Sequence, residues 1–267
     1  MFKHIEHRYV IYLLVAVVVA LPMLKPVGLP IDISGGVRQS YDFIESLPDG
    51  ITVLMIFDAT PTVFMDVGAT GTAFLEQAFR KNMNVINVCF KTEAIECFPK
   101  ALAALGRKDL VYGADYVDLG LIPGEETGQA ALAMGIHAVS PLDRYGKKLS
   151  EIPLTANVRS VGDIGLVLSM SGGNPGTESV VRQIGSRFPV PIVSGCTSGD
   201  ATKIWVLRDS GLVKGVVPGI KGGAEYEQLI QRPGYGTSSM DSMSGISLYV
   251  VGLLVVGNVM YFRSKAR

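Results

Sequence analysis

Val117-Asp-Leu-Gly-Leu-Ile-Pro-Gly-Glu-Glu-Thr-Gly128 and Leu212-Val-Lys-Gly-Val-Val-Pro-Gly-Ile-Lys-Gly-Gly223 follow one pattern. In both stretches an apolar run ends in Pro-Gly, and four glycine and proline positions recur in the same order. Further upstream, Ile51-Thr-Val-Leu-Met55 matches Ile164-Gly-Leu-Val-Leu168, and Gly71-Thr72 matches Gly176-Thr177 as the opening of a helix. Chance similarity is the alternative, because strand–helix units share a composition. We interpret the pattern as an internal duplication.

Six apolar runs alternate with amphipathic helical patterns along the middle of the chain. The predicted strands are Ile51–Phe57, Val85–Phe90, Val117–Ile122, Ile164–Ser169, Val190–Ser194 and Val213–Val217, and helical patterns include Thr72–Lys81, Glu93–Leu105 and Thr177–Phe188. Such alternation predicts a mostly parallel sheet with helices on both faces. Two βαβαβα halves, about 45–138 and 160–230, joined by a crossover linker 139–163, then predict an α/β, Rossmann-like, doubly wound fold. A receptor with one half in each of two lobes is the structural alternative.

Apolar segments lie near both ends of the chain, at Tyr9–Leu24 and Ile246–Phe262. The basic residues Lys3 and Arg8 precede the first segment, and Arg263, Lys265 and Arg267 follow the second. Because basic flanks are retained on the cytoplasmic side, we expect a two-pass cell-membrane protein. The tails 1–8 and 263–267 would be cytoplasmic, and the domain 25–245 would be extracytoplasmic. Both segments are short for spanning helices, and a signal peptide cleaved after Ala20 is the alternative for the first.

The composition argues against several classes of protein. The formal net charge of the 267 residues is zero and only 18% of them are charged, so a nucleic-acid partner is not expected. No dinucleotide fingerprint, Walker motif or cluster of metal ligands is visible, and we predict no cofactor, no metal and no catalytic residue. The three cysteines are expected to be buried thiols, with a Cys89–Cys97 bridge as the alternative.

A ligand site, if there is one, is expected at the carboxyl ends of the strands, between the loops after Phe57 and Ser169. Ser171-Gly-Gly-Asn-Pro-Gly-Thr177 could present N–H groups to a carboxylate or phosphate, or could be only a turn. Thr177 could cap the following helix or contact the ligand. Asp58 could point into the crevice or cap the next helix. A nucleophilic pairing of Cys196 with His137 is disfavoured. The candidate ligand-binding residues are Asp58, Thr60, Gly71, Thr72, Ser171, Gly172, Gly173, Asn174, Gly176, Thr177, Cys196, Thr197 and Ser198.

Several short stretches resemble an uncharacterised family of prokaryotic membrane-anchored proteins. They are Gly219-Ile-Lys-Gly-Gly-Ala-Glu-Tyr-Glu227, Met240-Asp-Ser-Met-Ser244, Gly257-Asn258, Asp115-Tyr-Val-Asp-Leu-Gly120 with Pro123-Gly124, and Gly195-Cys-Thr-Ser198. The resemblance covers most of the chain. It implies two terminal transmembrane helices around a Rossmann-like domain, and it implies no activity or site residues.

Two functions from different classes are compatible with these features. The first is a non-enzymatic component of a membrane assembly, in contact with the bilayer and forming a homo-oligomer or binding other membrane proteins through its terminal helices. Gly245 and Gly252, seven residues apart, would permit close helix contact, and Asn258 needs a polar partner at membrane depth. The second is an enzyme or receptor that binds a small anionic ligand in the crevice.

Overall fold

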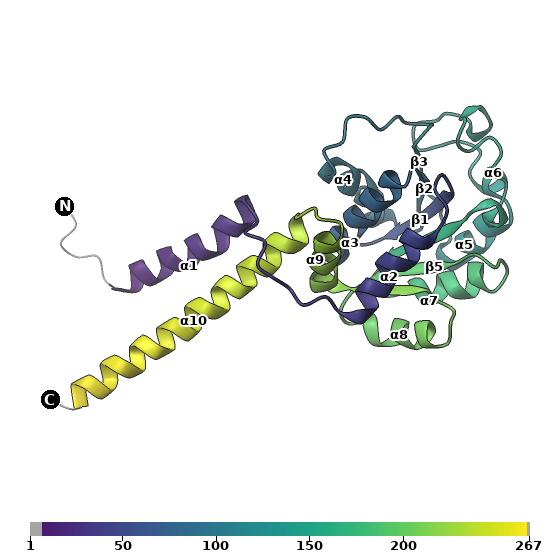
Figure 1. Cartoon of the computed structure of the whole chain (residues 1–267). Coiled ribbons are helices and arrows are strands. Elements are labelled where there is room, and N and C mark those ends of the chain that lie inside the picture. Colours follow the sequence, from purple (N-terminus) through teal and green to yellow (C-terminus); the bar gives the residue numbers. More distant parts are fainter. Residues whose placement is uncertain (1–6, 266–267) are drawn as a thin grey trace.

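The computed structural model describes residues 7–265, so the basic residues Lys3 and Arg267 lie outside the described part. Figure 1 shows an α/β domain from which two helices project side by side. The elements of the domain are built between residues 35 and 230, and the two projecting helices come from the ends of the chain. The predicted mixed α/β architecture is therefore confirmed.

The sheet contains six parallel strands in the order β3-β2-β1-β4-β5-β6. The strands are β1 (Thr52–Asp58), β2 (Asn84–Cys89), β3 (Tyr116–Leu121), β4 (Leu166–Ser171), β5 (Ile192–Cys196) and β6 (Gly215–Pro218). Each overlaps a predicted strand, because buried parallel strands read as short runs rich in Val, Ile and Leu. Direct pairing of β1 with β4 joins the two halves in one sheet, so two separate lobes do not form. The topology is that of a Rossmann-like fold.

Helices cover both faces of the sheet, and each face has its own apolar core. The face carrying Phe57 is covered by α2 (Gly35–Ser46), α3 (Pro61–Arg80), α4 (Cys97–Ala104) and α9 (Gly219–Leu229). The opposite face is covered by α5 (Glu125–Met134), α6 (Ile136–Val139), α7 (Thr177–Val180) with a π turn at Val181–Gly185, and α8 (Ala201–Asp209). Short 3-10 turns lie at Thr92–Ala94, Leu149–Glu151 and Val161–Asp163. The last two belong to the crossover linker.

The sequence pattern placed the start of the first crossover helix at Thr72. In the structure this helix, α3, begins eleven residues earlier, at Pro61. The side chain of Thr60 accepts a hydrogen bond from Val63 N (3.3 Å), and Pro61 occupies the first turn, which together form a strong start signal. Gly71-Thr72 is therefore inside α3 and is not the counterpart of Gly176-Thr177. The predicted helix Glu93–Leu105 is a 3-10 turn followed by the shorter helix α4, and the predicted helix Thr177–Phe188 is the short helix α7 that continues into a π turn.

The two Pro-Gly turns do occupy matching places in the fold. Pro123-Gly124 follows edge strand β3 and Pro218-Gly219 closes edge strand β6, and each glycine has a positive φ, +100° and +60° respectively. α5 starts directly after the first turn, at Glu125, and α9 starts within the second, at Gly219. These positions need glycine for backbone geometry, and the duplication itself stays a prediction.

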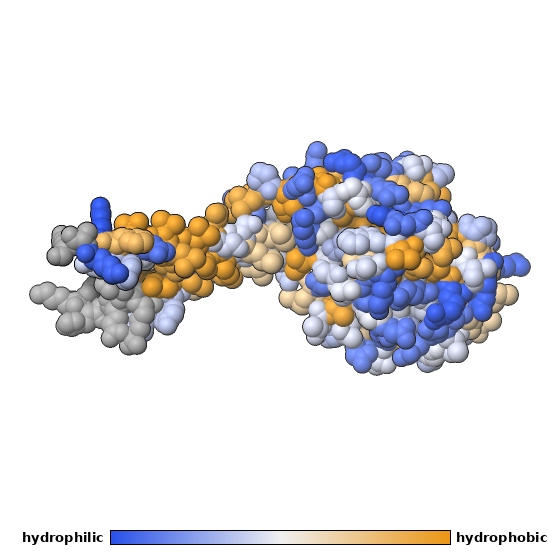
Figure 2. All heavy atoms as spheres, turned by 90° about the horizontal axis from the view of Figure 1, so that it is seen from below, coloured by the Kyte–Doolittle hydropathy of each residue, from blue (hydrophilic) through white to orange (hydrophobic). Residues whose placement is uncertain are grey.

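Of the two projecting helices, α10 (Tyr235–Lys265) is the longer, with 31 residues. Its length and apolar composition are sufficient to cross a membrane, and among the described residues no other helix meets both requirements. The helix starts at Tyr235, eleven residues before Ile246, where the predicted apolar segment begins. The apolar part of α1 (His7–Leu24), residues 9–24, is shorter and packs against α10. Figure 2 shows a band of apolar residues along this helix pair.

Two hydrogen bonds and one close approach are among the contacts between α1 and α10. Ser242 Oγ donates to the carbonyl of Val19 and Tyr249 Oη to that of Ile11, each at 3.1 Å. A Cβ added to Gly245 would lie 2.9 Å from Val18 Cγ1, so this glycine permits the close approach that the sequence predicted. Gly252 and Gly257 face open space. Asn258 Nδ2 donates to Leu254 O within its own helix (2.7 Å) and does not join the two helices.

Candidate functional site

The carboxyl ends of three central strands meet where the strand order reverses. Asp58 pairs in register with Ser171, and Ser171 pairs with Cys196. The structure thus brings together the loops that the sequence singled out after β1, β4 and β5. The chemistry available there depends on which of these side chains are free.

Asp58 is almost completely buried, with 1% of its surface exposed. Its Oδ1 accepts hydrogen bonds from the backbone N–H of Phe90 (2.5 Å) and Lys91 (3.2 Å), whereas Oδ2 has no hydrogen-bond partner. Burial raises the pKa of Asp58 to about 6, against the opposing effect of these hydrogen bonds. Asp58 does not cap α3, because Thr60 does. Its bonded oxygen fastens the end of β2 to the end of β1.

The glycine-rich loop after β4 is folded onto its neighbours. A Cβ on Gly172 would lie 2.5 Å from Thr197 Cγ2, and the Gly173 N–H donates to Asp200 Oδ2 (2.8 Å). Lys91 Nζ donates to Gly172 O (3.2 Å). Gly173 and Asn174 are exposed, while Ser171 and Gly176 are buried. The loop therefore has the expected position but is stabilised by contacts within the protein.

Thr177 neither caps a helix nor faces the crevice. The N-cap of α7 is Gly176, without a side-chain cap, and Thr177 is buried. Its hydroxyl contacts Ser194 Oγ (2.6 Å) and Ser169 Oγ (3.1 Å), which lie on β5 and β4. The predicted cap is therefore wrong, and the predicted ligand contact stays a prediction for a hydroxyl that is engaged inside the protein. The hydroxyl cluster instead links α7 to the buried face of the sheet.

Cys196 is also buried, with 1% of its surface exposed. Burial raises the pKa of its thiol to about 12, which opposes formation of a nucleophilic thiolate. The only domain histidine, His137, contacts Thr155 O through Nε2 (2.9 Å). All three cysteines are free and buried, so the Cys89–Cys97 bridge does not form.

The loop after β5 is held by two contacts with carboxylates. Thr197 Oγ1 donates to Asp200 Oδ2 (2.8 Å) and Ser198 N donates to Asp66 Oδ2 (3.3 Å).

Gly71 and Thr72 do not lie at the carboxyl ends of the strands. A Cβ on Gly71 would lie 2.7 Å from the Phe57 ring, and Thr72 Oγ1 donates to Gly68 O (2.9 Å) inside α3. Thr72 lines a cavity of about 350 Å³ between α3, α4 and the segment that connects α9 to α10. We call this space the junction cavity. Its lining residues are Phe64, Gly68, Ala69, Thr72, Ala73, Lys100, Ala104, Glu227, Ile230, Arg232, Pro233, Gly234 and Tyr235.

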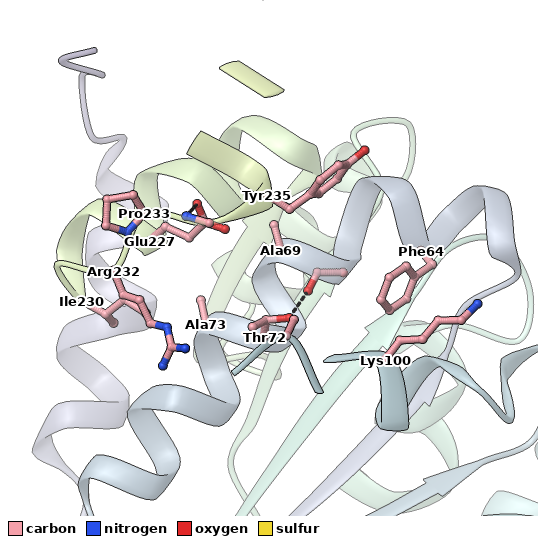
Figure 3. A pocket seen from close by; sticks show the side chains of 13 residues that line it. Phe64, Ala69, Thr72, Ala73, Lys100, Glu227, Ile230, Arg232, Pro233 and Tyr235 are labelled. Carbon is pink, nitrogen blue, oxygen red and sulfur yellow. Dashed lines mark hydrogen bonds between the residues drawn. The ribbon is translucent and has the colours of Figure 1, made fainter. Parts of the chain in front are cut away.

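Glu227 organises the start of α10 beside the junction cavity (Figure 3). Its Oε2 accepts from the N–H groups of Gly234 (2.8 Å) and Thr237 (2.7 Å) and from the Thr237 hydroxyl (2.6 Å), and its Oε1 accepts from Gly236 N (3.0 Å). A carboxylate at the N-terminus of a helix satisfies free N–H groups and interacts favourably with the helix dipole. Because Glu227 belongs to α9, this cap ties the projecting helix to the domain.

Asp241 makes a second tie one turn further along α10. It is buried, and its carboxylate accepts from three successive N–H groups, those of Val27 (2.7 Å), Gly28 (2.9 Å) and Leu29 (2.9 Å). The positive φ of Gly28, +74°, lets this loop curve around the carboxylate. Glu225 similarly accepts from Ser34 N and Oγ. The sequence analysis did not identify these three carboxylates as functional. They could have been found as acidic residues that lie within segments whose other residues are suited to burial.

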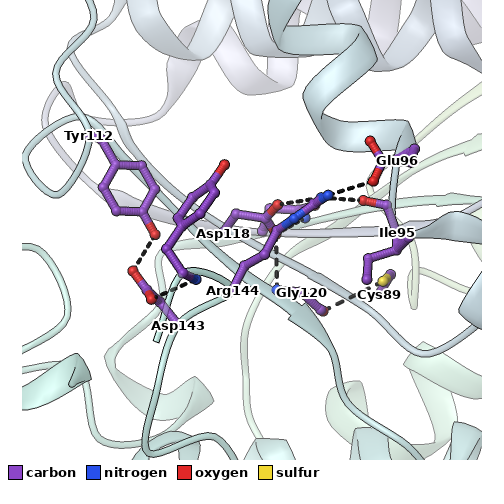
Figure 4. A network of polar contacts seen from close by, with 10 residues as sticks. Cys89, Ile95, Glu96, Tyr112, Asp118, Gly120, Asp143 and Arg144 are labelled. Atoms are coloured by element: carbon purple, nitrogen blue, oxygen red, sulfur yellow. Dashed lines mark hydrogen bonds and ion pairs between the residues drawn. The ribbon is translucent and has the colours of Figure 1, made fainter. Parts of the chain in front are cut away.

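A separate polar network holds the crossover linker to edge strand β3 (Figure 4). Arg144 bridges Asp118 Oδ2 (3.3 Å), Glu96 Oε1 (2.5 Å) and the carbonyl of Ile95 (2.5 Å). Asp118 also accepts from Asn87 Nδ2 (2.7 Å), and Tyr112 donates to Asp143 (2.5 Å). These contacts join the linker to the sheet, and one buried atom of the network, Asn87 Oδ1, has no hydrogen-bond partner. Within residues 7–265, no group of three or more His, Cys, Asp or Glu is placed to hold a metal ion.

Comparisons with known proteins add little. No protein-family model matches the chain, and neither does any curated protein. A solved structure titled "crystal structure of AibC" is weakly similar, with 11% sequence identity and a TM-score of 0.37. The alignment covers 84% of this chain and 54% of that one, so the chain spans about half the length of that protein. A likeness this weak carries no information on activity or partners.

Proposed function

We propose that this protein is a membrane-anchored α/β domain that acts as a non-enzymatic, structural component of a membrane assembly. The domain would lie on the extracytoplasmic side, carried by α1 and α10 as a two-pass anchor, with both termini in the cytoplasm. This architecture is also what the resemblance to the uncharacterised prokaryotic family implies. The partners would be further copies of the chain or other membrane proteins, reached through the helices.

The observation that carries this proposal is the buried, hydrogen-bonded junction between the domain and α10. A simple tether needs only a flexible linker. Here α10 starts inside the domain, its residues 236–242 are largely buried, and Glu227 and Asp241 fix it with charge-assisted hydrogen bonds. A fixed orientation of the domain on its helices is useful when several copies or partners must dock in register.

Native mass spectrometry on the full-length protein, extracted gently from its own membrane, tests the proposal. We expect one defined oligomer or one stoichiometric protein partner. A monomer that carries a non-lipid adduct of a few hundred daltons would contradict it and would point to the crevice instead.

A second candidate function is an enzyme or receptor that uses the crevice at the strand ends. Oδ2 of Asp58 favours it, because buried polar atoms without a hydrogen-bond partner are rare and some of them have a catalytic role. Substitution of the exposed Asn174 by alanine separates the two candidates. Loss of a bound small molecule with the assembly intact supports the crevice, and unchanged behaviour removes Asn174 from any such site.

A further inference from the structure

The base of the domain carries apolar surface at the level of the junction cavity. The contacts Ile11–Tyr249 and Val19–Ser242 show that α1 and α10 run antiparallel. Leu24 therefore lies about five residues nearer to the domain than Ser242, beside the first turns of α10, and 84% of its surface is exposed. Exposed apolar residues continue past the helix end to Val27 and Leu29.

Such a surface is expected where side chains meet lipid. If the helix pair is embedded, as proposed above, the bilayer surface reaches the base of the domain. Pro233 and Tyr235, which line the junction cavity, then lie at the depth of the lipid headgroups (Figure 3). Tyrosine is a residue typical of this interface.

The walls of the junction cavity are mostly apolar, from Phe64, Ala69, Ala73 and Ile230, and its polar groups are few. Its volume of about 350 Å³ falls in the lower part of the range for small-molecule sites. A site of this kind suits an amphipathic ligand of modest size.

The charges around the cavity favour an anion. Arg232 and Arg80 share the single carboxylate of Glu76, which leaves one positive charge in excess. Lys100 lines the cavity, is exposed, and among the described residues has no ion pair. The opposing charge of Glu227 is engaged by the four donors at the start of α10.

We infer that the junction cavity binds the headgroup of an anionic phospholipid from the adjoining leaflet. The phosphate would lie near Lys100, and the acyl chains would follow the exposed apolar surface of the helix pair; Arg232, on the other side of the cavity (Figure 3), would add to the positive potential. Basic pockets beside membrane helices recognise anionic lipids in this way. This inference rests on the membrane-embedded position of the helix pair in the proposed function, and it adds the class of lipid that the protein binds.

The test uses the full-length protein in detergent, stripped of lipid and titrated with phosphatidylglycerol or phosphatidylcholine while native mass spectrometry counts bound lipids. We expect one phosphatidylglycerol to bind more tightly than phosphatidylcholine. Lys100→Ala removes the free cation and Ala104→Trp fills the cavity from an exposed position on α4. Lys100→Ala should weaken phosphatidylglycerol binding about tenfold, the loss of one charge-assisted contact, and Ala104→Trp should weaken it by occupying the space of the headgroup. The controls are Lys108→Ala and Ala131→Trp, at exposed positions outside the cavity.

Equal affinity for the two lipids, or wild-type affinity in both cavity variants, would overturn the inference. Membrane fractionation of the same samples separates this failure from failure of the proposed function. If the wild-type chain sediments with membranes but shows no selective lipid, only the lipid site is wrong. If it does not sediment with membranes, the anchoring and the lipid site are both wrong.

Discussion

Three buried carboxylates show how the surroundings of one residue type determine its role. Glu227 and Asp241 have both oxygens satisfied by backbone N–H groups, so their charges are stabilised where two segments join. Asp58 has only one satisfied oxygen, and burial raises its pKa to about 6. Its charged form therefore costs folding free energy near neutral pH, whereas the other two charges hold the structure together.

The stability of Asp58→Asn relative to the wild type should increase as the pH rises. The folded protein keeps the Asp58 proton up to about pH 6, while the unfolded chain loses it near the ordinary value of 3.8. Wild-type stability therefore falls through this window, by at most about 3 kcal/mol. The difference in unfolding free energy between variant and wild type should shift in favour of the variant by about 2 kcal/mol from pH 4 to pH 7.5.

Urea unfolding of the full chain in detergent, followed by the fluorescence of Trp205, measures this difference; Trp205 is the only tryptophan and lies in the domain. Asp209→Asn, an exposed aspartate on the same helix as Trp205, serves as the control. A free-energy difference for Asp58→Asn that is the same at both pH values contradicts this role of Asp58.

Glu227→Ala should loosen the junction. It leaves three N–H groups and one hydroxyl at the start of α10 without their acceptor. We expect a loss of about 2–4 kcal/mol in unfolding free energy and faster proteolysis between α9 and α10. Glu126→Ala, which removes an exposed ion pair with Arg182, should change neither. Cleavage at the wild-type rate in Glu227→Ala would show that packing alone fixes the junction.

At the scale of elements, the pairing of α1 with α10 depends on one small residue. Gly245→Leu should push the helices apart, because even a Cβ there would lie 2.9 Å from Val18. Overpacking of this kind costs about 1–3 kcal/mol. The yield of disulfide between cysteines introduced at Val19 and Ser242 should fall severalfold. Gly252→Leu, facing open space, should leave the yield unchanged, and an equal loss in both variants would refute the specific contact.

The strands were predictable and several helix limits were not. Short apolar runs between turns identify buried parallel strands, so all six could be found from the sequence. The start of α3 is hidden because Gly68 and Gly71, inside the helix, resemble a turn, although both fit close packing against aromatic rings. The start of α10 is hidden because its cap, Glu227, comes from another helix.

The candidate site was predictable in position only. Strand ends converge by topology, so the order of the apolar runs suffices to place Asp58, Ser171 and Cys196 at one edge of the sheet. Whether a glycine-rich loop is open depends on distant partners, here Asp200 for Gly173 and Lys91 for Gly172. The inward turn of Thr177 depends in the same way on hydroxyl groups of two strands. Such contacts have no local signal in the sequence.

At the scale of the whole molecule, the position of the domain relative to the bilayer decides what the protein can contact. The helix pair and the domain form a continuous body (Figure 1), and the central claim is that α1 and α10 cross the membrane together with the domain outside. The native cysteines are buried, so an introduced cysteine can report its own side of the membrane.

Cysteine labelling with an impermeant maleimide in intact cells tests this claim most directly. The full-length variants are Lys108→Cys in the domain, Ser264→Cys near the end of α10 and Lys3→Cys near the amino terminus. We predict labelling of Lys108→Cys in intact cells and labelling of the two terminal variants only after permeabilisation. A protected Lys108→Cys, or labelling of either terminal variant in intact cells, would contradict the two-pass arrangement on which the proposed function depends.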